Sequence, residues 1–162
     1  MKNDEKAVMG LPTYLLVAII TSAAIIAIFS MSIYNISKDT QYQNITNEVD
    51  KILSEAENMF EYADSGTMVT LTVNLPQNMK FMVFGGLPEN NGLAPSTLTL
   101  NEVTSNDYYF VMDNGRSTTG HTNVRFSGEQ TNEISILYPG TYDLKLELVK
   151  ENNGKTYVKI FH

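Results

Sequence analysis

The first part of the chain contains a long apolar segment. From Ala7 to Ser37, 31 residues pass without one charged side chain. Within it, residues 11–36 read LPTYLLVAIITSAAIIAIFSMSIYNI, and a helix of these 26 residues would be about 39 Å long. A bilayer's hydrocarbon core is about 30 Å thick. The segment predicts a membrane-spanning helix that stays in the mature protein. A buried helix of a soluble protein and a cleaved secretory signal are the alternatives.

The polar and apolar positions that follow predict that the helix continues. Between Ser32 and Asp64 there is no glycine or proline, and apolar residues recur in alternating steps of four and three, as on one face of a helix. One helix over about residues 12–64 is predicted, with Gly66 as its terminator. Acidic and other polar side chains, Glu48 and Glu57 among them, fill the other faces. The apolar stripe consists of Ile45, Val49, Ile52, Ala56, Met59 and Ala63, widened by Leu53 and Phe60.

The stripe is interpreted as the seam where the helix packs on the chain's own C-terminal part. A coiled coil with another chain is the alternative. Five of its residues are the expected head-packing set: Ile45, Val49, Ile52, Met59 and Phe60.

From Thr67 onward the apolar period changes to two, which is typical of strands. Seven or eight short strands are predicted, around residues 69–75, 80–84, 98–100, 108–112, 124–126, 134–138, 142–148 and 156–161. Residues 87–95 and the Gly/Ser/Thr-rich residues 115–122 are predicted to be loops. The expected fold class is α+β, a long N-terminal helix packed on an antiparallel β-sandwich or barrel. The expected organisation is a short head (1–10), an apolar helix half (11–36), an amphipathic half (37–65) and a β ectodomain (66–162).

Composition removes several function classes. The 162 residues carry 11 Lys+Arg and 18 Asp+Glu, a net charge of −7, which argues against binding nucleic acid. There is no cysteine, and the only histidines are His121, in the predicted 115–122 loop, and His162. No phosphate-binding loop, zinc-protease motif or hydrolase nucleophile motif is present. We therefore expect no enzyme activity and no cofactor.

A few residues remain as candidate binding or modification sites. The oxygen-rich turns Glu89–Gly92 and Asp113–Gly115 could suit calcium, although turns use the same residues for backbone reasons. Tyrosines 108, 109, 138 and 142 could stack on a sugar or belong to the core. Asn35 and Asn44 begin N-x-S/T sequons. Within the apolar segment, Ala18 with Ser22 and Ala23 with Ala27 form small-xxx-small pairs suited to close helix packing.

The layout of the N-terminus carries a family resemblance. Lys2 and Lys6 precede the apolar segment, which favours this end inside the cell and the C-terminal part outside. The charged head, then Ala7-Val8-Met9-Gly10 and the apolar run from Leu11 to Leu16, resembles an archaeal type IV pilin-like precursor with a class III signal peptide. Two features depart from the pattern. Leu15 stands where bacterial pilins often have an acidic residue, and no basic residue directly precedes Gly10.

The resemblance implies a function and a set of partners. A prepilin peptidase would cut between Gly10 and Leu11, and the retained helix would assemble with copies of itself and with other pilin-like subunits in an extracellular filament. The alternative is an uncleaved, single-span surface protein whose β ectodomain binds a partner or a glycan.

Overall fold

The computed structural model describes residues 4–89 and 97–162 and contains one long helix and two β-sheets. Helix α1 extends from Asp4 to Tyr62. The chain forms two compact units, Met1–Tyr42 and Gln43–His162. The second unit includes the amphipathic part of α1 together with all the strands. The fold is thus α+β, as predicted.

Sheet A has the strand order β1-β7-β8-β5. β1 (Met68–Leu75) pairs along its whole length with β7 (Gly140–Lys150), and β7 pairs antiparallel with β8 (Thr156–Phe161). β5 (Phe126–Ser127) joins the other edge of β8 and runs parallel to it. The turn between β7 and β8 forms at residues 151–155, where the amide of Gly154 donates to the carbonyl of Glu151.

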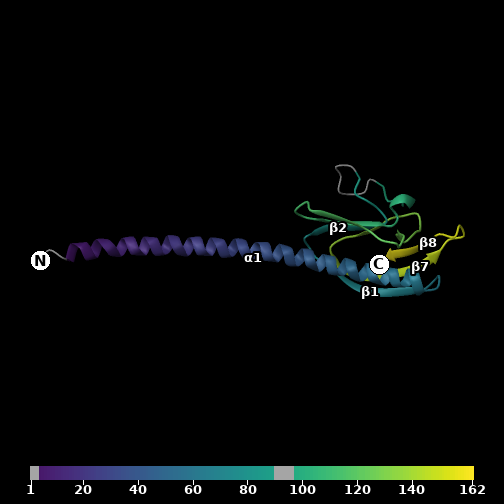
Figure 1. Cartoon of the computed structure of the whole chain (residues 1–162), viewed down its shortest axis with the longest axis horizontal. Coiled ribbons are helices and arrows are strands. Elements are labelled where there is room, and N and C mark those ends of the chain that lie inside the picture. Colours follow the sequence, from purple (N-terminus) through teal and green to yellow (C-terminus); the bar gives the residue numbers. More distant parts are fainter. Residues whose placement is uncertain (1–3, 90–96) are drawn as a thin grey trace. The chain divides into compact units, whose positions relative to one another are not determined.

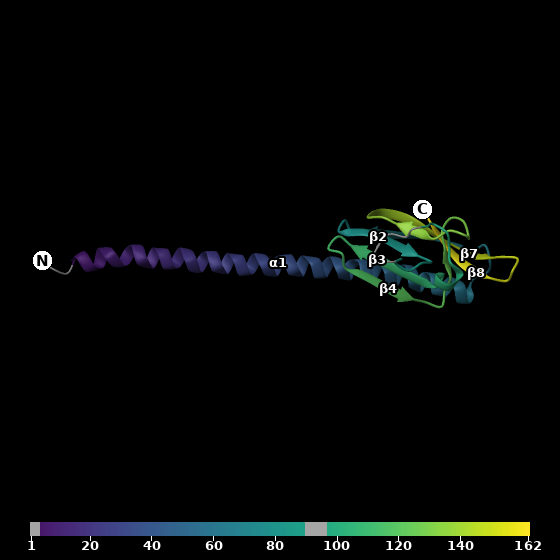
Figure 2. The same ribbon diagram turned by 90° about the horizontal axis from the view of Figure 1, so that it is seen from above.

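Sheet B has the order β4-β3-β2-β6 and is antiparallel throughout. It consists of β2 (Met79–Phe84), β3 (Asp107–Met112), β4 (Ser117–His121) and β6 (Ser135–Leu137). Figure 2 shows β2, β3 and β4 side by side. The short 3₁₀ helix η1 (Glu102–Thr104) precedes β3, and the Asn101 side chain caps it by accepting from the Val103 amide at 3.0 Å. Two separate sheets make the β part a sandwich and not a closed barrel.

The amphipathic part of α1 packs on the sheets. Ile45, Ile52 and Ala56 are fully buried, and Val49 and Met59 are 2% exposed. Figure 1 shows β1 alongside the last turns of the helix, and the Lys51 ammonium donates to the Thr72 carbonyl of β1. The helix is therefore held by burial of its apolar stripe and, at β1, by a direct hydrogen bond.

The central strands of sheet B are buried on both faces. Met82 and Phe84 of β2 lie on one face, whereas Val83 lies on the other, in a cluster with Tyr109 and Val111. Leu100, from the segment between β2 and β3, packs against this second cluster. Because both faces are covered, these strands read as continuous apolar runs and do not alternate.

Several boundaries differ from the predictions. The helix begins at Asp4, before the predicted residue 12, and continues through Pro12. It ends at Tyr62, and Gly66, with φ of +92°, lies four residues further on. Residues 98–100 form no strand, and only Thr99 makes an isolated bridge, to Glu133. Within 87–95, residues 90–95 lie outside the described residues.

The predicted loop at 115–122 contains strand β4 and is the clearest error in the β part. The backbone of Ser117–His121 pairs with β3, although its side chains alternate between exposed and half-buried. An edge strand of this kind needs no apolar face, so periodicity could not reveal it. The alternation along β1 predicts that Val69 and Leu71 are core residues, but both are only half-buried, whereas Val73 and Leu75 are buried.

Candidate functional site

The apolar half of α1 is the most distinctive surface of the chain. Its most apolar 18-residue window has a mean hydropathy of 2.4, and none of it is buried. The helix is long and apolar enough to cross a membrane, which makes it a candidate membrane anchor; a signal sequence has the same properties. Large apolar side chains are more than half exposed around the whole circumference: Leu15, Leu16, Val17, Ile19, Ile20, Ile25, Ile26, Ile28, Phe29, Met31 and Ile33.

Three hydroxyl groups in this half donate hydrogen bonds to carbonyls of the helix itself. Thr21 Oγ1 donates to the carbonyls of Val17 and Ala18 at 2.9 and 3.0 Å. Ser30 donates to the Ile26 carbonyl at 2.8 Å, and Ser32 to the Ile28 carbonyl at 3.0 Å. Each of these bonds gives a polar group a partner without water, which a hydrocarbon environment requires.

Aromatic residues flank the apolar segment at a spacing that fits a bilayer. Tyr14 and Tyr34 are 20 residues apart, or about 30 Å along the helix. Tyrosine is enriched where hydrocarbon meets headgroups. One turn beyond, the Lys38 ammonium lies 4.2 Å from the centre of the Tyr34 ring. Lys38 is the first charged residue after the apolar segment.

The two small-residue pairs lie on different faces of the helix. Ala18 and Ser22 occupy one ridge, and Ala23 and Ala27 another; the ridges are about 140° apart at roughly 100° per residue. All four residues are exposed. Small residues allow helix backbones to approach closely, so the apolar half offers two separate approach surfaces.

The structure places the other predicted site residues as follows. The backbone at Gly10 and Leu11 is helical, and the side chain of Leu11 lies outside the described part. Asn35 and Asn44 are exposed on α1. Of the head-packing set, Ile45, Val49, Ile52 and Met59 are buried, and Phe60 is half-buried.

The loop candidates give a mixed picture. The prediction that His121 is a solvated loop residue is correct in its exposure, at 69% of the side chain, but His121 ends strand β4, and its Nδ1 lies 2.6 Å from the Asp107 carboxylate of β3. Of the calcium candidates, residues 90–92 lie outside the described part, and Asp113–Gly115 is the turn between β3 and β4, where Gly115 donates to the Met112 carbonyl. No cluster of three or more histidine or acidic residues is found in the described ranges.

The tyrosines do not form one platform. Tyr109 is fully buried, whereas Tyr138 is 59% exposed. Burial, with a smaller contribution from the charge of Glu89, raises the pKa of Tyr109 to about 12. Its hydroxyl is buried with no hydrogen-bond partner among the described residues. Tyr109 therefore belongs to the core cluster of sheet B and is not available for stacking on a sugar.

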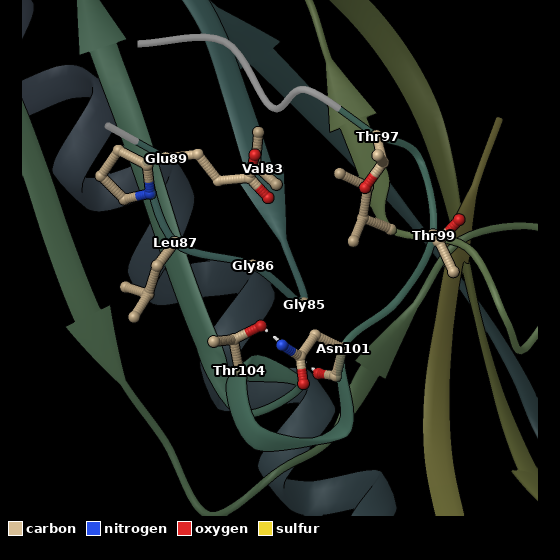
Figure 3. A pocket seen from close by; sticks show the side chains of 11 residues that line it. Val83, Gly85, Gly86, Leu87, Glu89, Thr97, Thr99, Asn101 and Thr104 are labelled. Carbon is tan, nitrogen blue, oxygen red and sulfur yellow. Dashed lines mark hydrogen bonds between the residues drawn. The ribbon is translucent and has the colours of Figure 1, made fainter. Parts of the chain in front are cut away.

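A recess of about 180 Å³ lies over sheet B (Figure 3). Val83 and Ile134 contribute apolar side chains, and Glu89 and Asn101 contribute polar ones. Its remaining lining consists of Gly85, Gly86, Leu87, Pro88, Thr97, Thr99 and Thr104. The described lining offers hydrogen-bonding groups and one carboxylate, without a nucleophile paired to a base.

Comparison with known proteins adds no family assignment: no protein-family model, no curated protein and no solved structure matches this chain.

Proposed function

We propose that this chain is a structural subunit, major or minor, of an extracellular type IV pilus-like filament, and that its apolar helix is the element through which it assembles. The observation that carries the proposal is the apolar surface of residues 13–36, which is exposed on all sides. Such a surface has to be covered by lipid or by other helices, because water-exposed apolar area is costly.

The two small-residue ridges favour a filament over a symmetric dimer. A symmetric dimer uses one surface twice, whereas an open helical assembly needs two different surfaces on every subunit. Ala18 with Ser22 and Ala23 with Ala27 supply two such surfaces, about 140° apart. Each helix can then approach two neighbours closely.

The proposal is tested by Ala23→Leu, with Ala24→Leu as the matched control. Ala24 has isoleucine four residues away on both sides, so it belongs to neither small-residue pair. Both variants should accumulate in membranes at the parent level. Only Ala23→Leu should be lost from the filament fraction sheared from cells. Normal entry of Ala23→Leu into filaments, or the absence of the parent from every filament fraction, would refute the proposal.

The second candidate is an uncleaved, membrane-anchored surface protein. The spacing of Tyr14 and Tyr34, about 30 Å along the helix, favours it because it matches the thickness of a bilayer's hydrocarbon core. The N-terminal residue of the mature protein separates the two candidates. A filament subunit should begin at Leu11, and Gly10→Leu should block its maturation. Intact mass measurement of the chain purified from native membranes decides, since an anchored protein would still begin at Met1.

A further inference from the structure

A second polar recess lies in the β-containing unit, between the helix and the end of β1. It has a volume of about 190 Å³ and is lined by Asn44, Asn47, Glu48, Asn74 and Pro76. The three helix residues are spaced at i, i+3 and i+4, which places them on one face. Glu48, expected on a solvated face, thus turns toward the sheet.

The hydrogen bond from Lys51 to Thr72 shows how the helix is aligned with β1, and the recess agrees with that alignment. Lys51 reaches Thr72, one turn further along α1 and two residues earlier on β1. Helix and strand run in opposite directions here, so residues 44–48 lie opposite residues 74–76. The lining is held on both sides by regular structure.

Glu48 is the unusual member of this lining. Its Oε2 is buried and has no hydrogen-bond partner among residues 4–89 and 97–162. Lys51, the basic residue one turn away on the helix, is bonded to the Thr72 carbonyl. The ion pairs found within the described part of the chain do not include Glu48. A buried carboxylate oxygen without a cationic or hydrogen-bonding partner is costly.

The neighbours of Glu48 can supply further oxygen ligands. Asn44, Asn47 and Asn74 each have an amide oxygen, and hard cations bind carboxylate and amide oxygens in preference to nitrogen. The Oδ1 of Asn74 already accepts from Thr141 Oγ1 at 3.3 Å and has a second lone pair. The candidate ligands are therefore one carboxylate, from Glu48, and three neutral amides.

We propose that Glu48, Asn44, Asn47 and Asn74 form a low-affinity site for a hard divalent cation, calcium in particular. The cation would neutralise the partly buried carboxylate, contacting its unpartnered Oε2, and link the helix to the end of β1. A single carboxylate gives a donor set of charge −1, which corresponds to the weak end of calcium affinities, with Kd about 10⁻⁴–10⁻³ M. Magnesium should bind more weakly, because it requires near-ideal octahedral geometry and gives up its water reluctantly. This site does not depend on filament assembly.

The test is a calorimetric titration of calcium chloride into the full-length protein in detergent micelles. Ionic strength is held constant, because the net charge of −7 would otherwise add a screening effect. The parent should bind one calcium per chain saturably. Glu48→Gln, which keeps the side-chain shape, should weaken binding at least tenfold. Circular dichroism establishes that the variant is folded.

Two further variants make the result specific. Glu57→Gln removes an exposed carboxylate nine residues along, on the opposite face of α1, and should bind calcium as the parent does. Asn74→Asp adds a second carboxylate and should tighten binding about tenfold. No saturable calcium binding by the parent, or unchanged binding by Glu48→Gln, would overturn the proposal.

Discussion

The substitution Ile52→Asp is the most direct test of the packing between helix and sheets. Ile52 is fully buried in the middle of the apolar stripe. Removing this buried apolar side chain lowers the free energy of unfolding by about 2 kcal/mol. The introduced carboxyl must also be neutralised, and protonating a group of pKa about 3.9 at pH 7 costs about 4 kcal/mol. The sum of about 6 kcal/mol is comparable with the whole stability of a typical domain, roughly 5–15 kcal/mol.

The dependence on pH distinguishes this mechanism from simple loss of packing. Burial raises the pKa of the introduced carboxyl above its unfolded value, so the folded state holds the proton more tightly. The stability deficit should therefore shrink as pH falls from 7 toward 5, by about 1.4 kcal/mol per pH unit. Ile52→Val, which introduces no charge, should cost about 0.5–1.5 kcal/mol without that pH dependence.

The assay is urea unfolding of the full-length protein in detergent, followed by the near-ultraviolet circular dichroism of its nine tyrosines. Asp50→Asn, at an exposed position on the same helix, serves as the surface control and should stay within about 0.5 kcal/mol of the parent. If Ile52→Asp unfolds within 1 kcal/mol of the parent, the stripe does not pack on the sheets, and a coiled coil with another chain becomes the better interpretation.

Three other predictions test the β part. Gly85→Ala should destabilise more than Gly115→Ala in urea unfolding: both have positive φ, but only at Gly85 would the new methyl lie 2.7 Å from Leu100, whereas it meets nothing within 4 Å at Gly115. Equal costs would refute this. Tyr109→Phe should stabilise by about 1 kcal/mol, because the hydroxyl has no described partner. The same substitution should change the alkaline stability profile. Between pH 10 and 12 the unfolded tyrosine loses its proton while the folded one, with its raised pKa, keeps it, so Tyr109 lowers the free energy of unfolding there and the phenylalanine variant should not. An unchanged alkaline profile would contradict this. Finally, residues 43–162 alone should fold cooperatively in water, whereas a thermal scan without a transition would show that this unit needs the apolar helix.

Regular periodicity explains which parts of the fold could be predicted. The stripe from Ile45 to Met59 and the alternation along β7 both bury one face, and each produces a clear period in the sequence. β4 could not be predicted in this way, because its place at the sheet edge depends on backbone pairing with β3. The Gly120 in this strand lies against the ring of Tyr108, where a side chain would lie 2.3 Å from ring atoms. That contact is visible only after folding.

The candidate sites show the same division between local and long-range information. The exposed apolar helix follows from composition and length alone. The recess around Glu48 depends on Asn74, which is 26 residues away and reaches the helix only through the register of β1. Similarly, the contact of His121 with Asp107 requires β4 to pair with β3. Neither arrangement has a signal in local spacing.

The internal hydrogen bonds of Thr21, Ser30 and Ser32 bear on how a helix of this kind could change its surroundings. With their donors occupied by the helix's own carbonyls, these hydroxyls need form no new bonds when lipid is exchanged for neighbouring helices. These three side chains are then equally well satisfied in lipid and among neighbouring helices. These three hydroxyls set no preference between lipid and neighbouring helices, so packing with neighbours would set the direction of any transfer.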